Sequence, residues 1–249
     1  MEQVKKLREM TGAGIMDCKR ALEASGGDIP KAATLLREKG IASAVKREAK
    51  EAREGLIGMS AQAARGAMIE LNCETDFVAR TDDFIKLAET LTRKVLEQGE
   101  GVLEQEPVLN LVRELSGKVG EKMVFRRANR YEAAAGTFVS SYLHSNKRIG
   151  VLVLMEGPQN EASLQCGKDI AMQVAAARAR FVSAKDVPAE MVEEKKRSFV
   201  EEIKNKPREI QEKIAKGKLE KWFNDICLLD QSFIKNEEQK VSAYLAEVS

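Results

Sequence analysis

The sequence predicts an α+β protein that begins with a small bundle of three helices and carries an antiparallel helical hairpin near its end. Three observations point to this class. Helical periodicity fills the first forty residues, short strand-like segments alternate with longer helical ones between residues 55 and 178, and a charged helical stretch follows from Pro188. Strands and helices intermixed at hairpin-like spacing are typical of α+β architecture.

The first forty residues contain three short segments with apolar residues at helical spacing. The second segment ends at Ser25, where two glycines follow. Asp28 is the predicted N-cap of the third helix, which we expect to end at Gly40 because glycine is common just past a helix terminus. The bundle is predicted to occupy residues 1–41, and the charged, alanine-rich residues 42–54 are predicted to be a semi-helical linker at a domain boundary.

The middle of the chain alternates short apolar segments with helical ones. The expected strands are 56–61, 67–72, 123–130, 137–143 and 149–155, and the expected helices are 82–97, 106–117 and 161–178. A strand, a turn with arginine and glycine, and a second strand occur twice, about eighty residues apart. We therefore expect two related core subdomains, at residues 55–140 and 141–249.

A charged helical region extends from Pro188 to about Leu229. It contains two apolar seams with an interruption, Asn205-Lys206-Pro207, between them. A proline at such a point ends or turns a helix, so we predict an antiparallel helical hairpin at about 188–229. A short strand or docking segment at 231–235 and a terminal helix around Tyr244 are expected to follow.

Charge and cysteine content narrow the function classes. Lysine and arginine number 41 against 39 aspartate and glutamate residues, which leaves a net charge of +2. A protein that neutralises phosphates usually carries a clear basic excess, so direct nucleic-acid binding is not expected. The four cysteines are isolated and there is a single histidine, which argues against a zinc site and suits a reducing compartment. No apolar signal segment or bilayer-length apolar stretch is present, so we expect a cytoplasmic protein without a membrane partner.

Motifs for covalent chemistry are weak. The run Gly-Ala-Gly at 12–14 resembles the start of a dinucleotide-binding loop, but no strand precedes it and the third glycine is missing. His144 is the candidate base for a hydrolase, and neither Tyr142 nor Ser145 beside it belongs to a nucleophile motif. We therefore expect no catalytic residue, no metal and no cofactor, although an enzyme built around His144 remains an alternative.

Residues 72–78 are the more informative of two candidate binding segments. Thr75 and Asp76 suit the N-cap of a helix that follows a buried strand, and Phe77 then falls beside the strand-to-helix turn. From the residues alone, a cap followed by a core phenylalanine is the more economical interpretation. An exposed aromatic that binds a partner is the alternative.

Two longer motifs occur in a fixed order along the chain. The first, Thr-Gly-Ala-Gly-Ile-Met-Asp-Cys-Lys-Arg-Ala-Leu at 11–22, includes Met16 and Lys19, which by themselves would be an ordinary charged helix face. The second is Asn-Cys-Glu-Thr-Asp-Phe-Val-Ala at 72–79. Shorter matches follow at 119–121, 141–144, 149–152, 181–182, 187–188 and 228–234. With these motifs the chain resembles the elongation factor Ts family over its whole length.

The resemblance implies a fold and a function. The family's fold consists of a ubiquitin-associated-like three-helix domain, a two-subdomain α+β core and an inserted helical hairpin. Its members are guanine nucleotide exchange factors that bind the translational GTPase elongation factor Tu and promote GDP release during translation elongation, without being enzymes. A dimer of the heterodimer is compatible with the resemblance.

The resemblance also implies which residues contact the GTPase. Asp76 and Phe77, with Thr75 and Val78 beside them, match the segment that the family wedges against the GTPase helices near the magnesium and phosphates. The other implied contacts are Lys19 and Met16 in the N-terminal helices, Val119, Gly120 and His144 in the core, and Ile234 and Lys235 near the end. Such a protein needs no covalent chemistry, because a higher affinity for the nucleotide-free state is enough to drive release.

The chain departs from the family in its second subdomain. Gln173 and Ala179 stand where members often have histidine and proline, and residues 145–147 after His144 are less glycine-rich, which bears on the shape of the His144 contact. A lysine-rich RNA- or ribosome-binding protein is the other alternative. A steep salt dependence of RNA binding, with no effect on a GTPase, would favour it.

Overall fold

A computed structural model describes residues 1–45, 50–62, 64–203 and 207–248. The chain divides into two compact units. The first contains Met1–Ala61, Arg65–Tyr131 and Leu143–Gly150, and the second contains Gln62–Ala64, Glu132–Tyr142 and Val151–Ser249. Helices and small sheets are combined in the chain, which confirms the predicted α+β class.

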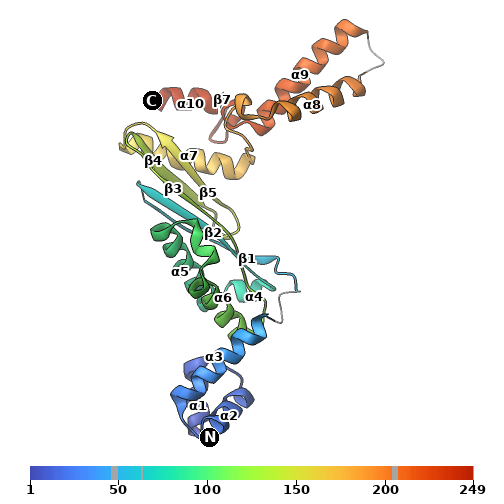
Figure 1. Ribbon diagram of the computed structural model, residues 1–249. Helices are drawn as coiled ribbons and strands as arrows, with labels where there is room; N and C mark the ends of the chain where they lie inside the picture. The colour runs from blue at the N-terminus through green and yellow to red at the C-terminus, as the bar shows by residue number, and fades with distance from the viewer. Residues whose placement is uncertain (46–49, 63, 204–206, 249) are drawn as a thin grey trace. The chain divides into compact units, whose positions relative to one another are not determined.

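The first unit begins with the predicted three-helix bundle, α1 (Glu2–Thr11), α2 (Ile15–Ala24) and α3 (Ile29–Val45) (Figure 1). Leu7, Cys18 and Ala32, one from each helix, are fully buried and form its centre. Asp28 caps α3 as expected, since its Oδ1 accepts a hydrogen bond from the backbone N–H of Lys31 at 2.9 Å. These three side chains give the bundle a core of its own.

The expectation that Gly40 ends the third helix is wrong. Helix α3 continues through it to Val45, and α6 (Glu106–Val119) packs across it. A Cβ atom at Gly117 of α6 would lie 2.5 Å from the Gly40 backbone, so the two glycines allow a close helix crossing. Residues 46–49 of the predicted linker lie outside the described residues.

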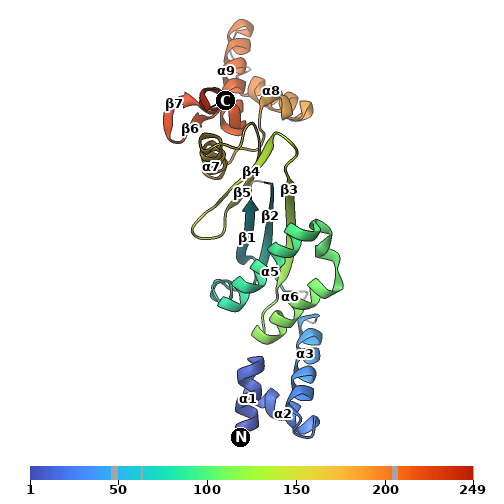
Figure 2. The ribbon, with the colours of Figure 1, turned by 90° about the vertical axis from the view of Figure 1, so that its left-hand side faces the viewer.

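A three-stranded sheet forms the centre of the first unit, with the order β1 (Glu54–Gln62), β2 (Arg65–Cys73) and β3 (Val124–Glu132). Figures 1 and 2 show α5 (Asp82–Gln98) lying against this sheet. A Cβ at Gly58 would lie 2.4 Å from the Thr92 hydroxyl, so β1 passes directly beneath α5. The connection to α6 is a 3-10 helix, η1 (Glu100–Glu104). The buried core includes Leu56, Ile69, Leu71, Phe84, Leu91, Val95 and Phe125.

The second unit combines β4 (Thr137–Leu143) and β5 (Gly150–Glu156), which pair with each other, with α7 (Glu161–Ala177). A Cβ at Gly167 would lie 2.7 Å from the Ser140 side chain, so α7 packs closely on β4. A 3-10 helix η3 (Leu228–Asp230), a short sheet of β6 (Ser232–Phe233) and β7 (Asn236–Lys240), and helix α10 (Val241–Val248) follow. These elements share a core with α7 that contains Cys166, Ile170, Leu228, Phe233 and Val241.

The predicted single strand at 231–235 is wrong in its bounds. Strand β6 has only two residues and pairs antiparallel with β7, with Ser232 opposite Lys240 and Phe233 opposite Asn236. Residues 234 and 235 form the turn between the strands. The backbone N–H of Ile234 donates to the side chain of Gln173 on α7 instead of to a neighbouring strand, which ends the pairing.

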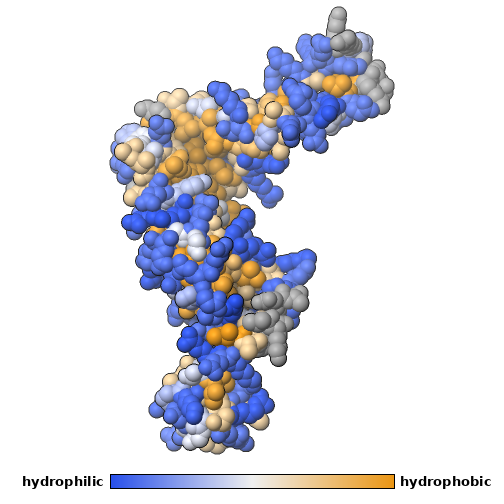
Figure 3. All heavy atoms as spheres, in the orientation of Figure 1, coloured by the Kyte–Doolittle hydropathy of each residue, from blue (hydrophilic) through white to orange (hydrophobic). Residues whose placement is uncertain are grey.

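The predicted helical pair is formed by α8 (Ala189–Glu202) and α9 (Arg208–Ile226), which pack against each other (Figure 1). A 3-10 helix, η2 (Ala184–Asp186), precedes them. At their base, Val187, Ile226 and Cys227 are buried among Trp222 and other apolar residues. No side chain of α8 is buried, and Figure 3 shows mostly hydrophilic residues over the pair. Of the predicted interruption, Pro207 is the N-cap of α9, and Asn205 and Lys206 lie outside the described residues.

Candidate partner-binding site

The segment after β2 folds into a four-residue helix, α4 (Asp76–Ala79). Thr75 is its N-cap, and the Thr75 hydroxyl oxygen accepts a hydrogen bond from the backbone N–H of Val78 at 3.4 Å. Thr81 then caps α5, since its hydroxyl accepts from the backbone N–H of Phe84. Two caps six residues apart fix both ends of the turn and therefore its orientation on the sheet.

Phe77 is the exposed member of α4. Its side chain is 80% exposed, whereas Val78 and Ala79, the next two residues, are buried in the core of the first unit. The interpretation of Phe77 as a core aromatic is therefore wrong. Val78 and Ala79 occupy the inward positions of the short helix, and the fully buried aromatic nearby is Phe84.

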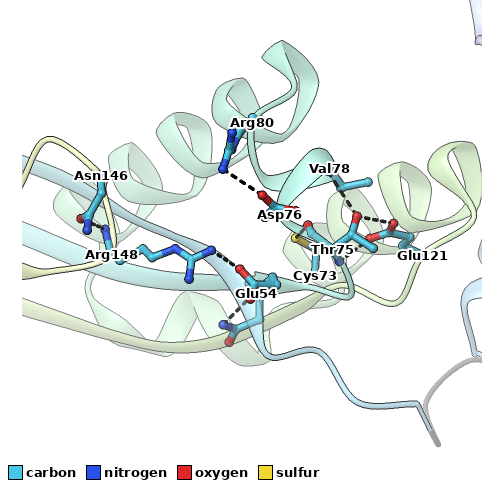
Figure 4. Close-up of polar contacts among 10 residues, drawn as sticks. Glu54, Cys73, Thr75, Asp76, Val78, Arg80, Glu121, Asn146 and Arg148 are labelled. Carbon is cyan, nitrogen blue, oxygen red and sulfur yellow. Dashed lines mark hydrogen bonds and ion pairs between the residues drawn. The ribbon is translucent and has the colours of Figure 1, made fainter.

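The loop after α6 holds this turn in place (Figure 4). The Glu121 carboxylate accepts the backbone N–H of Thr75 at 3.0 Å and the Thr75 hydroxyl at 2.7 Å. In return, the Glu74 carboxylate accepts the backbone N–H of Lys122 at 2.6 Å and the ammonium of Lys50 at 2.8 Å. Hydrogen bonds to carboxylates are stronger than neutral ones, so this reciprocal pair fixes two chain segments to each other.

The reciprocal bonds bring two predicted contact segments together. Val119 and Gly120 immediately precede Glu121, so they lie beside the Thr75 turn. Val119 is 37% exposed, and Gly120 takes a φ of +85° as the C-cap of α6, a conformation that favours glycine. The Ser116 hydroxyl donates to the backbone carbonyl of Glu121 at 2.6 Å, which sets the path of the loop.

Asp76 has an ionic partner in the free protein. Its Oδ2 lies 2.8 Å from the Arg80 guanidinium, one helical turn away. An exposed ion pair of this spacing contributes only about 0.3–0.5 kcal/mol. Asp76 can therefore exchange Arg80 for another group at small cost.

His144 lies in a tight turn between β4 and β5. Its backbone N–H donates to the carbonyl of Ile149 at 2.9 Å, and its Nδ1 accepts the backbone N–H of Asn146 at 3.4 Å. Lys147 adopts a left-handed φ of 55°, a conformation in which glycine is more usual. Arg148 forms an ion pair with Glu54 at the start of β1, so the turn is anchored to the sheet (Figure 4).

The other predicted contact residues lie on different elements. Met16 on α2 is 60% exposed, and the Lys19 ammonium lies 4.0 Å from Glu23 on the same helix. The hydrogen bonds that hold the Thr75 turn involve Glu121 and Val78 and neither of these two residues. In the second unit, Ile234 is 40% exposed, and Lys235 forms a 2.7 Å ion pair with the buried Asp169.

Sequence reasoning did not predict which residues support these contacts or how they do so. Glu121, Glu74 and Arg80 hold the Phe77 turn, and Asp169 and Gln173 hold the Ile234 turn. Apart from Arg80, which pairs with the nearby Asp76, these residues have partners far away in the sequence, and local patterns cannot indicate such pairs. The available signals were the positions of Glu74 and Glu121 within the matched motifs at 72–79 and 119–121, and the departure from the family at Gln173.

The described residues also bear on metal binding and membrane insertion. Within the described ranges, no three His, Cys, Asp or Glu side chains are grouped as a metal site would require. Among the same residues, no helix is both long and apolar enough to cross a bilayer.

Comparison with known proteins gives the class of the chain. Residues 74–249 match the family model described as elongation factor TS. The chain is 45% identical to elongation factor Ts of Aquifex aeolicus, over 99% of this chain and 92% of that protein. It is 39% identical to elongation factor Ts of Deinococcus radiodurans, over 100% of this chain and 96% of that protein. The fold and these matches define a translation elongation factor. The chain belongs to the elongation factor Ts family, which confirms the resemblance.

Proposed function

We propose that this protein binds elongation factor Tu and promotes GDP release from it as a nucleotide exchange factor. The observation that carries the proposal is Phe77, an aromatic side chain that is 80% exposed on a turn with fixed ends. Large exposed aromatics are unusual on a free protein surface and are enriched where proteins bind one another. The family membership supports the choice of partner.

Exchange follows from differential affinity. A factor that binds the nucleotide-free GTPase more tightly than the GDP-bound one lowers the affinity for GDP by the same factor, because coupling is reciprocal. Full burial of a phenylalanine ring contributes about 1.5–3 kcal/mol. If that burial occurs only when the nucleotide site is opened, Phe77 alone supplies roughly a ten- to hundredfold change in GDP affinity.

The remaining contacts hold the GTPase while Phe77 acts. We assign Asp76 to the part of this turn that faces the phosphate-binding region of the GTPase. Because its ion pair with Arg80 is weak, its carboxylate can bind groups of the GTPase instead. Val119 and Gly120 extend the same surface, and His144 provides a further core contact. Met16 and Lys19 on α2, and Ile234 and Lys235 in the second unit, are assigned to separate contacts.

The deciding experiment is stopped-flow release of fluorescent GDP from elongation factor Tu. Phe77→Ala is expected to slow release about tenfold or more, equivalent to at least ~1.4 kcal/mol of coupling. The variant should unfold at the wild-type temperature, because an exposed side chain contributes little to the core. Tyr131→Ala is the matched control, since Tyr131 is another exposed aromatic of the first unit, and it should release GDP at the wild-type rate. Equal rates for Phe77→Ala and wild type would contradict the wedge.

A further inference from the structure

Helix α7 carries two buried polar residues one helical turn apart. Asp169 is 4% exposed and Gln173 is fully buried. Residues four positions apart lie on the same face of a helix, and buried polar groups are costly unless they are hydrogen-bonded. Both side chains bond to the segment of residues 231–235, which contains β6 and the turn before β7.

Gln173 takes the place of a strand neighbour for this segment. Its Oε1 accepts the backbone N–H of Ile234 at 2.8 Å, and its Nε2 donates to the backbone carbonyl of Ser232 at 3.1 Å. The same Nε2 donates to Oε1 of Gln231 at 3.1 Å, and the Gln231 amide donates to the backbone carbonyl of Asp225 at 3.0 Å. Every polar atom of the Gln173 amide is therefore used to hold the turn.

Asp169 holds the other half of the turn. Its Oδ1 accepts hydrogen bonds from the ammonium of Lys235 at 2.7 Å and from the Gln165 amide at 2.8 Å. Its Oδ2 accepts the hydroxyl of Tyr244 at 3.1 Å, and the Tyr244 ring stacks on Phe233 with centroids 4.2 Å apart. Burial, followed by this bond to Asp169, raises the pKa of Tyr244, so its hydroxyl remains a donor.

The turn needs this support because its own sheet is too small to hold it. Strand β6 has two residues and its pairing with β7 is irregular, and an isolated pair of short strands has little stability. Ile234 nevertheless has 40% of its surface exposed at the apex. A rigid turn with an exposed apolar side chain loses little conformational entropy on binding, which favours affinity.

We propose that Gln173 and Asp169 are positioning residues that fix Ile234 and Lys235 for contact with the protein partner. This rests on the proposed function, because the partner is the GTPase named there. Since the Lys235 ammonium already bonds to a buried carboxylate, Ile234 is the side chain whose burial adds affinity, and the surface it fits on the partner is apolar. Gln173 acts on binding through Ile234 and not on the nucleotide, so it governs affinity and not the maximal exchange rate.

The test measures GDP release at increasing concentrations of this protein. Gln173→Leu, which removes both the donor and the acceptor, is expected to raise the half-saturating concentration about tenfold while the maximal rate stays within about twofold. Ile234→Ala should give a similar rise. The double variant should have a half-saturating concentration no higher than that of the single variant that binds less tightly. The reason is that Ile234 is no longer held in its binding position once Gln173 is lost. Additive effects, or a wild-type half-saturating concentration for Gln173→Leu, would overturn the proposal.

Two further variants separate positioning from general loosening. A neutral imidazole has one donor and one acceptor, which are enough to replace the bonds of Gln173 to the Ser232 carbonyl and the Ile234 N–H, so Gln173→His should restore the half-saturating concentration. Ile170→Ala loosens the same helix at a buried apolar site and leaves every bond to the turn in place, so it should bind as wild type does while folded. If Ile170→Ala weakens binding as much as Gln173→Leu, the effect belongs to the helix as a whole and the proposal is wrong.

Hydrogen exchange of the Ile234 amide in the free protein tests the positioning of the turn separately from the proposed exchange function. Gln173→Leu should speed this exchange at least tenfold, because the N–H loses its acceptor. Unchanged hydrogen exchange would refute the positioning role of Gln173, whatever the GTPase assay shows. If exchange speeds up as expected but the wild-type protein does not accelerate GDP release, the proposed function fails and the positioning of the turn stands.

Discussion

Position 77 and its neighbours show how one residue of register decides which side chain faces water. Thr75 could be predicted as a cap from its type and its place after a strand, and the structure confirms it. The direction of Phe77 could not be predicted, because a four-residue helix is too short for a periodic pattern. Its exposure follows from Val78 and Ala79 filling the core, and those contacts come from residues distant in sequence.

Cys73, the last residue of β2, gives a prediction about pH. The thiol is fully buried, and burial, with smaller contributions from the Glu121 and Glu54 carboxylates, raises its pKa from 9.0 to about 12. In the unfolded chain the thiol ionises at its ordinary pKa, so between pH 9 and 12 the folded state holds the additional proton. The stabilising contribution is therefore complete below pH 9 and is lost as the pH rises toward 12.

The measurement is urea unfolding at pH 8.5 and 10.5. The free energy of unfolding of the wild type is expected to fall across this range, with Cys73 contributing up to about 1.4 kcal/mol per pH unit. Cys73→Ala should show a smaller fall, and the difference between the two proteins isolates this thiol from the lysines and the other cysteines. Identical pH dependence of the two proteins would contradict the assignment.

The crossing of α3 and α6 shows what an element-level prediction misses. Gly40 has the local signature of a helix terminus, yet the helix passes through it because Gly117 comes close from α6. Arg37 and Glu114, one turn before each glycine and 77 positions apart, form an ion pair across the same crossing. A contact between residues this far apart in the sequence cannot be predicted from the local spacing of apolar residues. Most core helices and strands were nevertheless predicted to within two residues, because their apolar residues recur at helical or strand spacing between clear turn signals.

Gly117→Ala is expected to destabilise the protein. Alanine is the better helix former by about 1 kcal/mol, but its methyl group would meet the Gly40 backbone at 2.5 Å, and overpacking typically costs 1–3 kcal/mol. Thermal and urea unfolding should both show a net loss. The matched control is Gly217→Ala on α9, where the added methyl has no atom within 4 Å, so it should keep or raise the stability by up to about 1 kcal/mol. A stabilising Gly117→Ala would show that the crossing is loose.

For the whole molecule, the helical pair α8 and α9 has its apolar cluster at the base, while Ile203 at the other end of α8 is also buried. The base cluster holds Trp222 and Phe223 against Val187, Ile226 and Cys227, whereas farther out Phe199 packs under the ammonium groups of Lys195 and Lys218. The sequence predicted both helices from their apolar seams. It could not predict where burial stops, because the seam residues look alike along the full length.

Replacing residues 196–218 with a short glycine–serine loop is expected to leave the thermal transition of the remaining protein within about 4 °C of wild type. None of the described residues removed belongs to the base cluster, although Ile203 among them is buried, so the base keeps its packing. Trp222→Ala provides the contrast. It opens the base itself and should lower the transition by at least about 5 °C. Unfolding of the deletion variant at room temperature would show that the outer half of the pair is part of the folding unit.

The bonds between Thr75 and Glu121 also set an order of events during synthesis. They join residues 46 positions apart. A chain that grows from its N-terminus at about 5–20 residues per second contains the Phe77 segment roughly 2–9 s before the carboxylate that fixes it exists. A nascent chain therefore carries the aromatic before it carries the support. The turn acquires its final geometry only after α6 and the loop beyond it have been made. The rate of translation between residues 77 and 121 therefore sets how soon the Phe77 turn can reach its folded conformation.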